Sequence, residues 1–231
     1  MNAFQIGDLG ITDTIQNPRI ISNGLLGYWS FSEGTGSVVH DFSGNNNHGT
    51  LVNSPEWGGG VRGGSLKFDG INQHVNLGTF TDLDGATAFT VAMWIKPKSL
   101  PVSGHQGLFA RGSTNQRVPW IWCWDGASYL YTQIETVGQG ASDGNLGTTN
   151  VTQGVWTHVV FTWDGSLVKY FLNAVVGAGT DATLDDTLSA TNGFNYIGYV
   201  SGFTYFNGAI DDVRIYSRAL SQPEITTLYN G

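Results

Sequence analysis

The chain has 231 residues, of which 40% are hydrophobic and 13% aromatic, so it is long and apolar enough to bury a core. Its 10 basic and 18 acidic side chains give a net charge of −8, which disfavours binding to nucleic acid phosphates. No apolar run approaches the roughly 20 residues needed to cross a membrane, and the single cysteine, Cys123, excludes an intrachain disulfide.

The first 23 residues have no clear hydrophobic period and contain turn-forming residues such as Asn17 and Pro18. We therefore expect residues 1–23 to form an N-terminal arm that could dock onto a partner, and residues 24–231 to form one domain. The segment Met1–Gln5 lacks the basic region and apolar core of a secretory signal. A virion protein assembled inside a host needs no such signal, so we expect a location on a virion or on an extracellular surface.

From Leu25 onward, strand-length segments rich in β-branched and aromatic residues alternate with turn signals. The clearest case is a hairpin in which Trp156–Trp163 and Leu167–Leu172 flank the pair Asp164-Gly165, which suits a tight reversal. The other candidate strands are Leu25–Phe31, Ser65–Phe68, His74–Leu77, Phe89–Lys96, Gln106–Ala110, Trp120–Trp124, Tyr129–Glu135, Tyr196–Tyr199 and Gly208–Tyr216. So many short strands predict an all-β, two-sheet antiparallel sandwich.

One short helical turn is expected at the C-terminal end. Ser221 with Glu224 three residues later forms a capping-box pattern, and Pro223 lies in the first turn. Ile225 and Leu228 would then give this helix an apolar face.

Several ordered segments resemble laminin-G-like domains of the concanavalin-A-like lectin/glucanase jelly-roll superfamily. They are Gly27–Gly36, Asp41–Leu51, Leu66–Gly70, Phe89–Ile95, Trp156–Gly165 and Phe206–Leu220. The likeness spans about Gly24 to Tyr229 and implies two packed antiparallel sheets with one concave face. Such domains occur in lectins, pentraxins, adhesion proteins and enzyme appendages, so the fold does not settle the function.

The carboxylates do not have the spacing of a glycosidase. Glucanases of this superfamily place two glutamates and an aspartate at alternating positions on one strand. Glu135 has no second carboxylate two or four residues away, and Glu33, Glu56 and Glu224 lie in predicted loops or in the helix cap. We therefore expect no catalytic activity, with a glycan-active enzyme as the remote alternative.

A structural calcium site is a better chemical prediction. Asp41, Asn45 and Asn47 offer several oxygens within one turn, and Ca²⁺ takes six to eight oxygen ligands. The family resemblance places the terminal strand beside the N-terminal strand, so Asp211 could complete the site. In the alternative interpretation, Asp41 and the asparagines satisfy turn amides, while Asp211 and Arg214 pair or cap locally.

An aromatic hairpin offers a candidate ligand surface, which we call the aromatic wall. Its members share one face by the two-residue period of a strand, with Trp124 opposite Tyr129 and Trp122 opposite Tyr131 across a short loop. The wall consists of Trp120, Trp122, Trp124, Tyr129 and Tyr131.

Smaller apolar residues, Ile121, Cys123 and Leu130, line the other face of this hairpin. If they form the core, the aromatic wall is exposed or lies under a loop, where its rings could bind a sugar or a protein partner. Arg111, Gln116 and Arg117 would then supply hydrogen bonds at its rim. If the wall itself is core, it serves only packing.

These features predict a noncatalytic recognition or adhesion module that binds carbohydrate or protein and is displayed on a viral particle. The alternative is a structural capsid decoration protein of a phage or virus, without a glycan ligand, that contacts a capsid protein through residues 1–23. Neither interpretation involves nucleic acid or membrane insertion.

Overall fold

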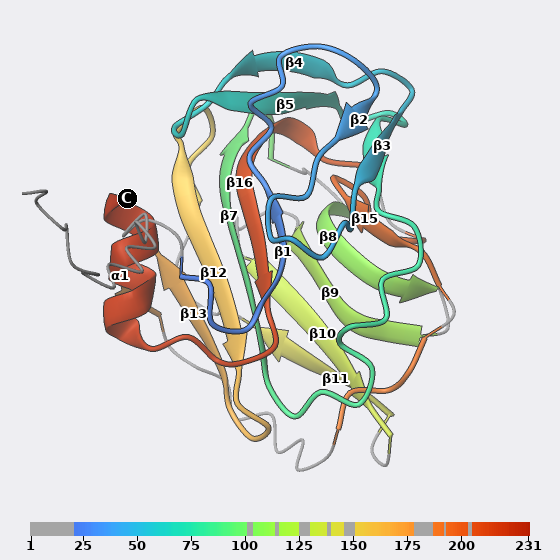
Figure 1. The fold of residues 1–231 in the computed structure, drawn as a ribbon, viewed down its shortest axis with the longest axis vertical. Helices are drawn as coiled ribbons and strands as arrows, with labels where there is room; N and C mark the ends of the chain where they lie inside the picture. Colours follow the sequence, from blue (N-terminus) through green and yellow to red (C-terminus); the bar gives the residue numbers. More distant parts are fainter. Residues whose placement is uncertain are drawn as a thin grey trace, which may run out of the picture.

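The computed structural model describes residues 21–100, 104–113, 116–124, 130–137, 140–145, 151–177, 187–191, 193–202 and 205–231. Within them, two antiparallel sheets pack face to face and one helix lies against the outside (Figure 1). The predicted all-β sandwich is therefore confirmed. No helix of this described part is long and apolar enough to span a membrane.

Eight strands form the first sheet, sheet A. They are β1 (Leu25–Trp29), β4 (Glu56–Gly59), β5 (Gly64–Asp69), β7 (Phe89–Pro97), β12 (Thr157–Trp163), β13 (Val168–Leu172), β14 (Val175–Val176) and β16 (Asn207–Tyr216). Their order is β14-β13-β12-β7-β16-β5-β4, and β1 pairs with the second half of β16.

Eight further strands form sheet B. They are β2 (Val38–Val39), β3 (Gly49–Val52), β6 (His74–Asn76), β8 (His105–Ser113), β9 (Gln116–Trp124), β10 (Leu130–Thr136), β11 (Gly140–Asn145) and β15 (Asn195–Ile197). Their order is β11-β10-β9-β8-β15-β6-β3-β2.

The main core lies between the two sheets and follows the alternation of the strands. On β7, Val91, Met93 and Ile95 face this core, whereas Ala92 belongs to a second apolar cluster on the outer face of sheet A. Both faces of β7 are buried, which explains why its sequence reads as a nearly continuous apolar run.

The predicted hairpin of β12 and β13 is confirmed. Trp163 pairs with Val168 across the turn, and the Asp164 carboxylate accepts hydrogen bonds from the amides of Ser166 (3.1 Å) and Leu167 (2.8 Å). Gly165 has a φ of +94°, which a glycine adopts without strain. The sequence did not predict β2, β3, β4, β11 and β14; four of these have at most four residues, β11 has six, and none shows a clean apolar alternation.

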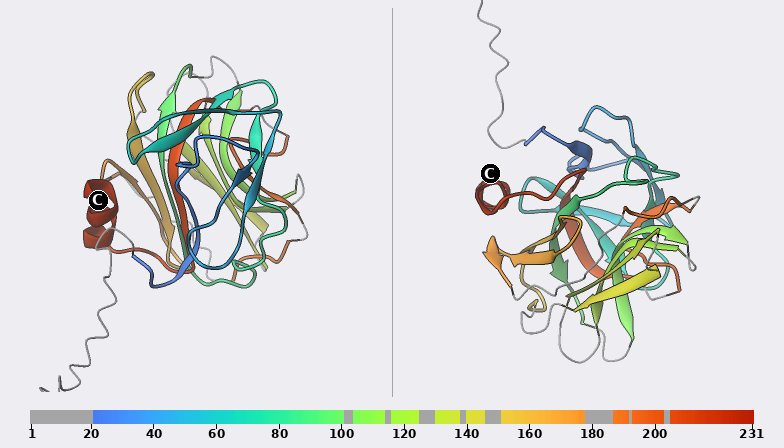
Figure 2. Two further views of the ribbon diagram at one scale, coloured as in Figure 1. Left: turned by 45° about the horizontal axis from the view of Figure 1, so that its top comes forward. Right: turned by 90° about the horizontal axis from the view of Figure 1, so that it is seen from below.

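Helix α1 (Gln222–Asn230) packs on the outer face of sheet A (Figure 2). The Glu224 carboxylate accepts hydrogen bonds from the backbone N–H of Ser221 (2.8 Å) and from its hydroxyl (2.7 Å), as the capping-box pattern predicts. Ile225 and Leu228 are buried against the sheet. Residues 1–20 of the predicted arm lie outside the described residues, and Ile21 packs against the same cluster as the helix.

Strand β16 contains a bulge next to the residues that pair with the N-terminal strand β1. The register of β16 against β7 shifts between Asp211 and Arg214, and Asp212 has a φ of +53°. The buried Asp212 carboxylate pairs with the Arg214 guanidinium at 3.0 Å, and this guanidinium also lies 4.4 Å from the ring centre of Tyr28 on β1.

Replacing Asp212 by asparagine should therefore destabilise the protein. Asparagine tolerates the left-handed backbone but leaves the Arg214 charge buried without its counterion, so we expect Asp212→Asn to lower the free energy of unfolding by about 3 kcal/mol. The matched control is Glu56→Gln at the exposed Lys67–Glu56 pair (3.2 Å), expected to cost less than about 1 kcal/mol. Urea unfolding measures both, and equal losses would contradict the role of the buried pair.

A buried histidine under α1 predicts a pH effect on stability. The ring of His158 is 2% exposed and lies 5.1 Å from the ring of Trp94 and 6.0 Å from that of Tyr229. Burial, with the nearby charges of Arg214 and Arg62, lowers the pKa of His158 from 6.5 to about 3. Between these values the unfolded chain binds a proton that the folded chain does not, so the histidine destabilises the fold as the pH falls.

We therefore expect the wild-type protein to lose stability relative to His158→Phe, by up to about 1.4 kcal/mol per pH unit, as the pH falls below about 6.5. Phenylalanine retains an aromatic ring but cannot be protonated. Asp211, whose pKa burial raises to about 6, acts in the opposite direction in both proteins and cancels in the comparison. Parallel stability curves for the two proteins would show that His158 does not titrate in this way.

Candidate binding surface

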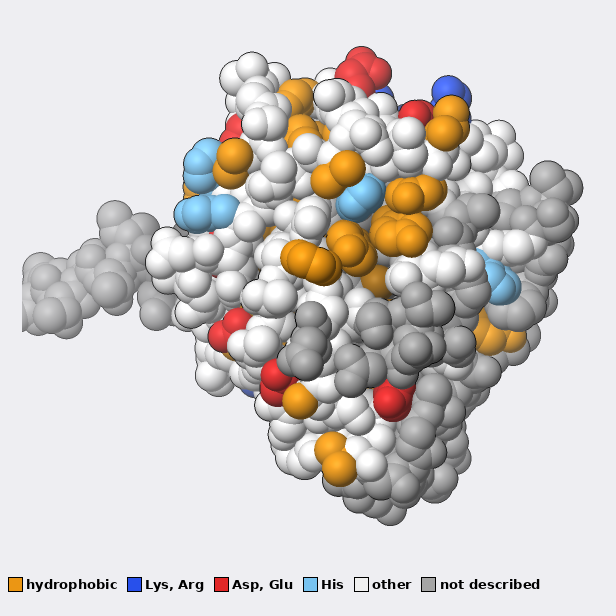
Figure 3. All heavy atoms as spheres, turned by 90° about the vertical axis from the view of Figure 1, so that its right-hand side faces the viewer, with side chains coloured by type: hydrophobic (Ala, Val, Ile, Leu, Met, Phe, Trp, Pro, Cys, Tyr) orange, Lys and Arg blue, Asp and Glu red, His pale blue; other side chains and the backbone are white. Residues whose placement is uncertain are grey.

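A group of aromatic side chains lies on the outer face of sheet B. We call it the aromatic patch, and it consists of His74, Phe194, Tyr196, Tyr199 and Tyr205. Figure 3 shows hydrophobic and histidine side chains gathered on this side of the molecule.

Strand alternation places the first members of the patch. Val75 on β6 and Ile197 on β15 pair with each other and are fully buried in the main core. Their neighbours His74 and Tyr196 therefore face outward, and their rings lie 5.3 Å apart, edge to face. Phe194, two residues before Tyr196, points to the same side and is 49% exposed.

The loop after β15 adds the other two tyrosines. The Phe206 amide donates to the Gly198 carbonyl at 2.9 Å, which closes the loop, and the Gly198 amide donates to Leu108 on β8. Within the closed loop the rings of Tyr199 and Tyr205 stack 4.4 Å apart at an angle of 17°. Both rings also lie within 6 Å of the His74 ring. The result is a continuous aromatic surface built from distant parts of the sequence.

The aromatic patch is uncharged at neutral pH. Burial lowers the pKa of His74, so its imidazole is neutral. Burial, and then the neighbouring Tyr199, raise the pKa values of Tyr196 and Tyr205 above 10. Such a surface offers flat ring faces for C–H groups and phenolic hydroxyls for hydrogen bonds.

Two residues of the predicted aromatic wall, Trp120 and Tyr131, lie on this same outer face. Ile121 and Leu130 belong to the main core, so the smaller side chains of the hairpin face inward. Trp120 is only 1% exposed because Val200, from the loop after β15, packs on it, and Tyr131 packs against the same cluster. The sequence left open whether the wall forms the core or lies outside it, exposed or under a loop. At Trp120 the structure shows the second arrangement, with a loop covering the ring.

For the remaining residues of the aromatic wall the structure describes part of the backbone but not the side chains. Trp122 pairs with Tyr131, as predicted. The side chains of Arg117, Trp122 and Trp124 are outside the described part of the structure, as is Tyr129 entirely.

The sequence placed Arg111 at the rim of the aromatic wall, but the structure does not. It is fully buried in β8, where its guanidinium pairs with the Asp84 carboxylate. Because its side chain is fully buried, Arg111 is unavailable to a ligand.

The turn predicted to bind calcium is held together by hydrogen bonds. The Asp41 carboxylate accepts from the backbone amides of Tyr28 (2.9 Å), Ser43 (2.8 Å) and Asn47 (2.9 Å), and from the Ser43 hydroxyl (2.8 Å). The side-chain amides of Asn45 and Asn47 donate to the Leu26 carbonyl. These contacts are those of the alternative interpretation, in which the residues satisfy turn amides.

Asp211, the fourth predicted calcium ligand, has its contacts elsewhere. One of its oxygens accepts hydrogen bonds from the amides of Val61 (2.7 Å) and Arg62 (2.8 Å) in the turn between β4 and β5. Its proposed alternative partner, Arg214, pairs with Asp212 instead.

The Asp41 carboxylate is engaged by hydrogen bonds from the protein itself in the arrangement seen. Both oxygens of Asp41 already accept two hydrogen bonds each. Within the described residues, no three His, Cys, Asp or Glu side chains come together as a metal site. Calcium binding therefore stays a prediction from the sequence.

The comparisons with known proteins agree with this architecture. A laminin G family model, described as the concanavalin A-like lectin/glucanases superfamily, matches residues 69–226. The match covers more than half of the chain, so the protein belongs to this superfamily, and the resemblance seen in the sequence is confirmed. Among curated proteins no significant match was found.

Solved structures with the same fold include several binding domains. Domain 4 of AbnA, a GH43 extracellular arabinanase from Geobacillus stearothermophilus, in complex with arabinotriose, has a TM-score of 0.70 and 24% identity over 89% of this chain and 98% of that one. The binding domain of Paraclostridial Mosquitocidal Protein 1 has a TM-score of 0.74 and 16% identity over 90% of this chain and 52% of that one. At these identities the likeness shows the fold alone.

An enzyme is also among the similar structures. Trypanosoma rangeli sialidase has a TM-score of 0.65 and 19% identity, over 89% of this chain and 32% of the sialidase. The chain thus spans only about a third of the sialidase and about half of the mosquitocidal binding domain.

Removing the Asp41 carboxylate should destabilise the turn even without metal. Asp41→Ala leaves three backbone amides without their acceptor, so we expect the free energy of unfolding in chelator to fall by about 2–4 kcal/mol. Thermal unfolding in chelator and in excess calcium, for the wild type and the variant, measures this. A wild-type midpoint that rises with calcium, together with a variant midpoint that does not, would instead support the calcium site.

Proposed function

We propose that this protein is a noncatalytic recognition module that binds a carbohydrate through the aromatic patch. The observation that carries the proposal is the stacked pair Tyr199 and Tyr205 beside His74 on an outer sheet face. Stacked rings with hydroxyl tips suit the apolar C–H face and the hydroxyl groups of a sugar. The lack of charge at neutral pH favours an uncharged saccharide at this surface.

The names of the similar structures support a binding role. Domain 4 of the arabinanase was solved with arabinotriose, and the binding domain of botulinum neurotoxin DC was solved with SialylT and with rat synaptotagmin II. These ligands are two saccharides and one protein, and the protein domains share this fold. We favour a saccharide for the aromatic patch because its ring stacking and neutral state match sugar chemistry.

The roles of the acidic side chains favour binding over catalysis. Glu56 pairs with Lys67, and Glu224 pairs with Arg218 and caps helix α1. Asp41 caps a turn through four hydrogen bonds. Glycoside hydrolysis needs two carboxyl groups facing one bond, and these three have structural partners instead.

Display on a viral particle, and docking to a capsid protein through residues 1–23, remain proposals from the sequence. The same holds for the virion or extracellular location. A particle-binding assay with the full chain and with a variant lacking the arm would address them.

Removing the stacked rings should abolish sugar binding. We expect the double variant Tyr199→Ala with Tyr205→Ala to lose at least tenfold in affinity on a glycan array, about 1.4 kcal/mol or more, because the flat face is lost. The double variant with phenylalanine at both positions keeps the rings and should retain more of the binding. Phe42→Ala removes a 55%-exposed aromatic side chain elsewhere and serves as the control.

Unfolding midpoints of all variants must stay close to the wild type, so that lost binding is not lost folding. Unchanged array binding by the double alanine variant would exclude the aromatic patch as the sugar site. Binding of a protein receptor but of no glycan, lost in the same variant, would replace the carbohydrate in the proposal by a protein.

A further inference from the structure

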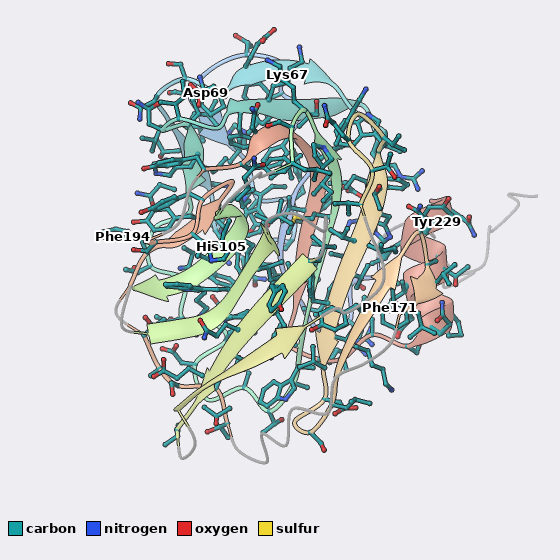
Figure 4. The ribbon with its side chains drawn as sticks, turned by 180° about the vertical axis from the view of Figure 1, so that it is seen from behind. Lys67, Asp69, His105, Phe171, Phe194 and Tyr229 are labelled. Atoms are coloured by element: carbon teal, nitrogen blue, oxygen red, sulfur yellow. The ribbon has the colours of Figure 1, made fainter. Side chains whose placement is uncertain are left out.

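A second candidate site lies on the outer face of sheet A, whereas the aromatic patch lies on the outer face of sheet B. A cavity of about 630 Å³ opens there between β4, β5, β7, β16 and the segment before β12. We call it the lysine pocket, because Lys67, Lys96 and Lys98 line it together with Trp156 and Ala209. Figure 4 shows Lys67 at the end of the sandwich, in a different region from Phe194 of the aromatic patch.

The strand register explains the shape of the lysine pocket. Ala209 on β16 pairs with Lys67 on one side and with Lys96 on the other. The neighbours Leu66, Ile95 and Ile210 face the main core, so these three residues form an outward row. Adjacent strands lie about 4.8 Å apart, which puts the two lysine backbones about 10 Å apart with only a methyl group between them.

The floor of the pocket is kept low by small residues. Gly208, next to Ala209, also lines the cavity, and a Cβ atom there would lie 2.5 Å from the backbone carbonyl oxygen of Lys96. A larger residue is therefore excluded at this position. One wall is tied in place by the Gly154 amide, which donates to the Pro97 carbonyl at 2.7 Å.

The charge of the pocket contrasts with that of the chain. The sequence has a net charge of −8 and four lysines, of which Lys169 alone lies outside this cavity. Lys67 pairs with Glu56 at 3.2 Å. Lys96 and Lys98 are exposed, and neither forms an ion pair with any described residue.

The acidic side chains of the pocket are already engaged. Glu56 is paired with Lys67, and the Asp69 carboxylate accepts a hydrogen bond from the Ile71 amide at 2.8 Å. The lining therefore carries three ammonium groups against two carboxylates, and the size of the cavity lies within the ~300–1,000 Å³ typical of small-ligand sites. The indole of Trp156 provides a flat apolar wall beside them.

We propose that the lysine pocket binds an acidic saccharide, meaning a sugar ring that carries a carboxylate or a sulfate group. Lys96 and Lys98 pair with the anionic group, with Lys67 beside them, and the ring lies against Trp156. Gln73 and Gln153, which also line the cavity, offer hydrogen bonds to hydroxyl groups. This second site rests on the proposed function in one respect, since its ligand is also a sugar. It shares no residue with the aromatic patch.

Calorimetry with the full chain tests this proposal. The probes are digalacturonate, its uncharged dimethyl ester, galactose 6-sulfate and inorganic sulfate. We expect digalacturonate or galactose 6-sulfate to bind at low ionic strength, and to bind at least tenfold more weakly when salt screens the lysines. Which of the two binds more tightly identifies the anionic group, while the ester and inorganic sulfate should bind at least tenfold more weakly than the better acidic sugar.

The double variant Lys96→Gln with Lys98→Gln should weaken acidic sugar binding at least tenfold, whereas Lys169→Gln, which changes an exposed side chain on β13 outside the pocket, should not change it. The double alanine variant at Tyr199 and Tyr205 should also leave it unchanged, which separates this proposal from that of the aromatic patch. The proposal is overturned if neither acidic sugar binds, if the ester or inorganic sulfate binds as tightly, or if the Lys96 and Lys98 variant binds normally.

Discussion

Strand β16 holds the sandwich together because it pairs with three other strands. It pairs with β7 on one edge, while on its other edge it pairs first with β5 and then with β1. The change of partner occurs at the bulge between Asp211 and Arg214. The register shift of the bulge is against β7, and on the opposite edge the pairing with β5 ends at Ile210 and that with β1 begins at Val213.

Buried charges secure this change of partner. Asp211 holds the turn between β4 and β5 through the amides of Val61 and Arg62. Asp212 points to Arg214, whose guanidinium lies over the ring of Tyr28 on β1. Neighbouring acids thus fasten the strands on either side of the bulge. Burying a carboxylate is costly, and the cost is offset by the Arg214 guanidinium at Asp212 and by two amide hydrogen bonds to one oxygen of Asp211.

Closing the fold in this way leaves the outer faces of the sheets available for different chemistry. Sheet A carries helix α1 over part of its outer face and the lysine pocket over another part. Sheet B carries the aromatic patch. One surface is positively charged and the other uncharged, so the two would take different ligands without competing.

The sequence predicted those elements whose signals are local. The β12–β13 hairpin follows from an Asp-Gly pair between two apolar runs, and α1 follows from Ser221 and Glu224. Both signals lie within a few residues, so tertiary contacts were not needed to read them. The order of the superfamily motifs then predicted the two-sheet arrangement, which the fold and the family match confirm.

The sites depend on contacts between distant residues, and the sequence could not show these. His74 meets Tyr199 and Tyr205 only because β6 and β15 are neighbours in sheet B. The local signal that points to this surface is the density of aromatic residues between positions 194 and 206. For the hairpin of Trp120, both faces are apolar, so periodicity alone could not say which side meets the core.

The residue types of the Asp41 turn likewise could not settle its role. Aspartate and asparagine oxygens serve equally as calcium ligands and as acceptors for turn amides. Which use is made depends on where backbone N–H groups point, and that follows from the folded turn. In the structure the amide of Tyr28, on β1, and the amide of Asn47, in the turn, both point at the carboxylate.

Both sheets contain an alanine that lies between larger residues on the two neighbouring strands, but the space above it differs. In sheet B, Ala110 pairs with Tyr196 on one side and with Trp120 on the other, and Val200 from a loop packs with Ala110 and Trp120. In sheet A, Ala209 lies between two lysines, and there the space stays open as a cavity.

A small residue between large neighbours makes a hollow on a pleated surface, and what fills the hollow determines its use. An apolar hollow gains free energy when the chain's own side chain covers it, since water is excluded from apolar surface. A hollow flanked by ammonium groups has no such drive towards self-covering, because burying an unpaired charge is unfavourable. The lysines therefore keep the pocket of sheet A open until an anion enters, whereas the hollow of sheet B closes and supports the tyrosines beside it.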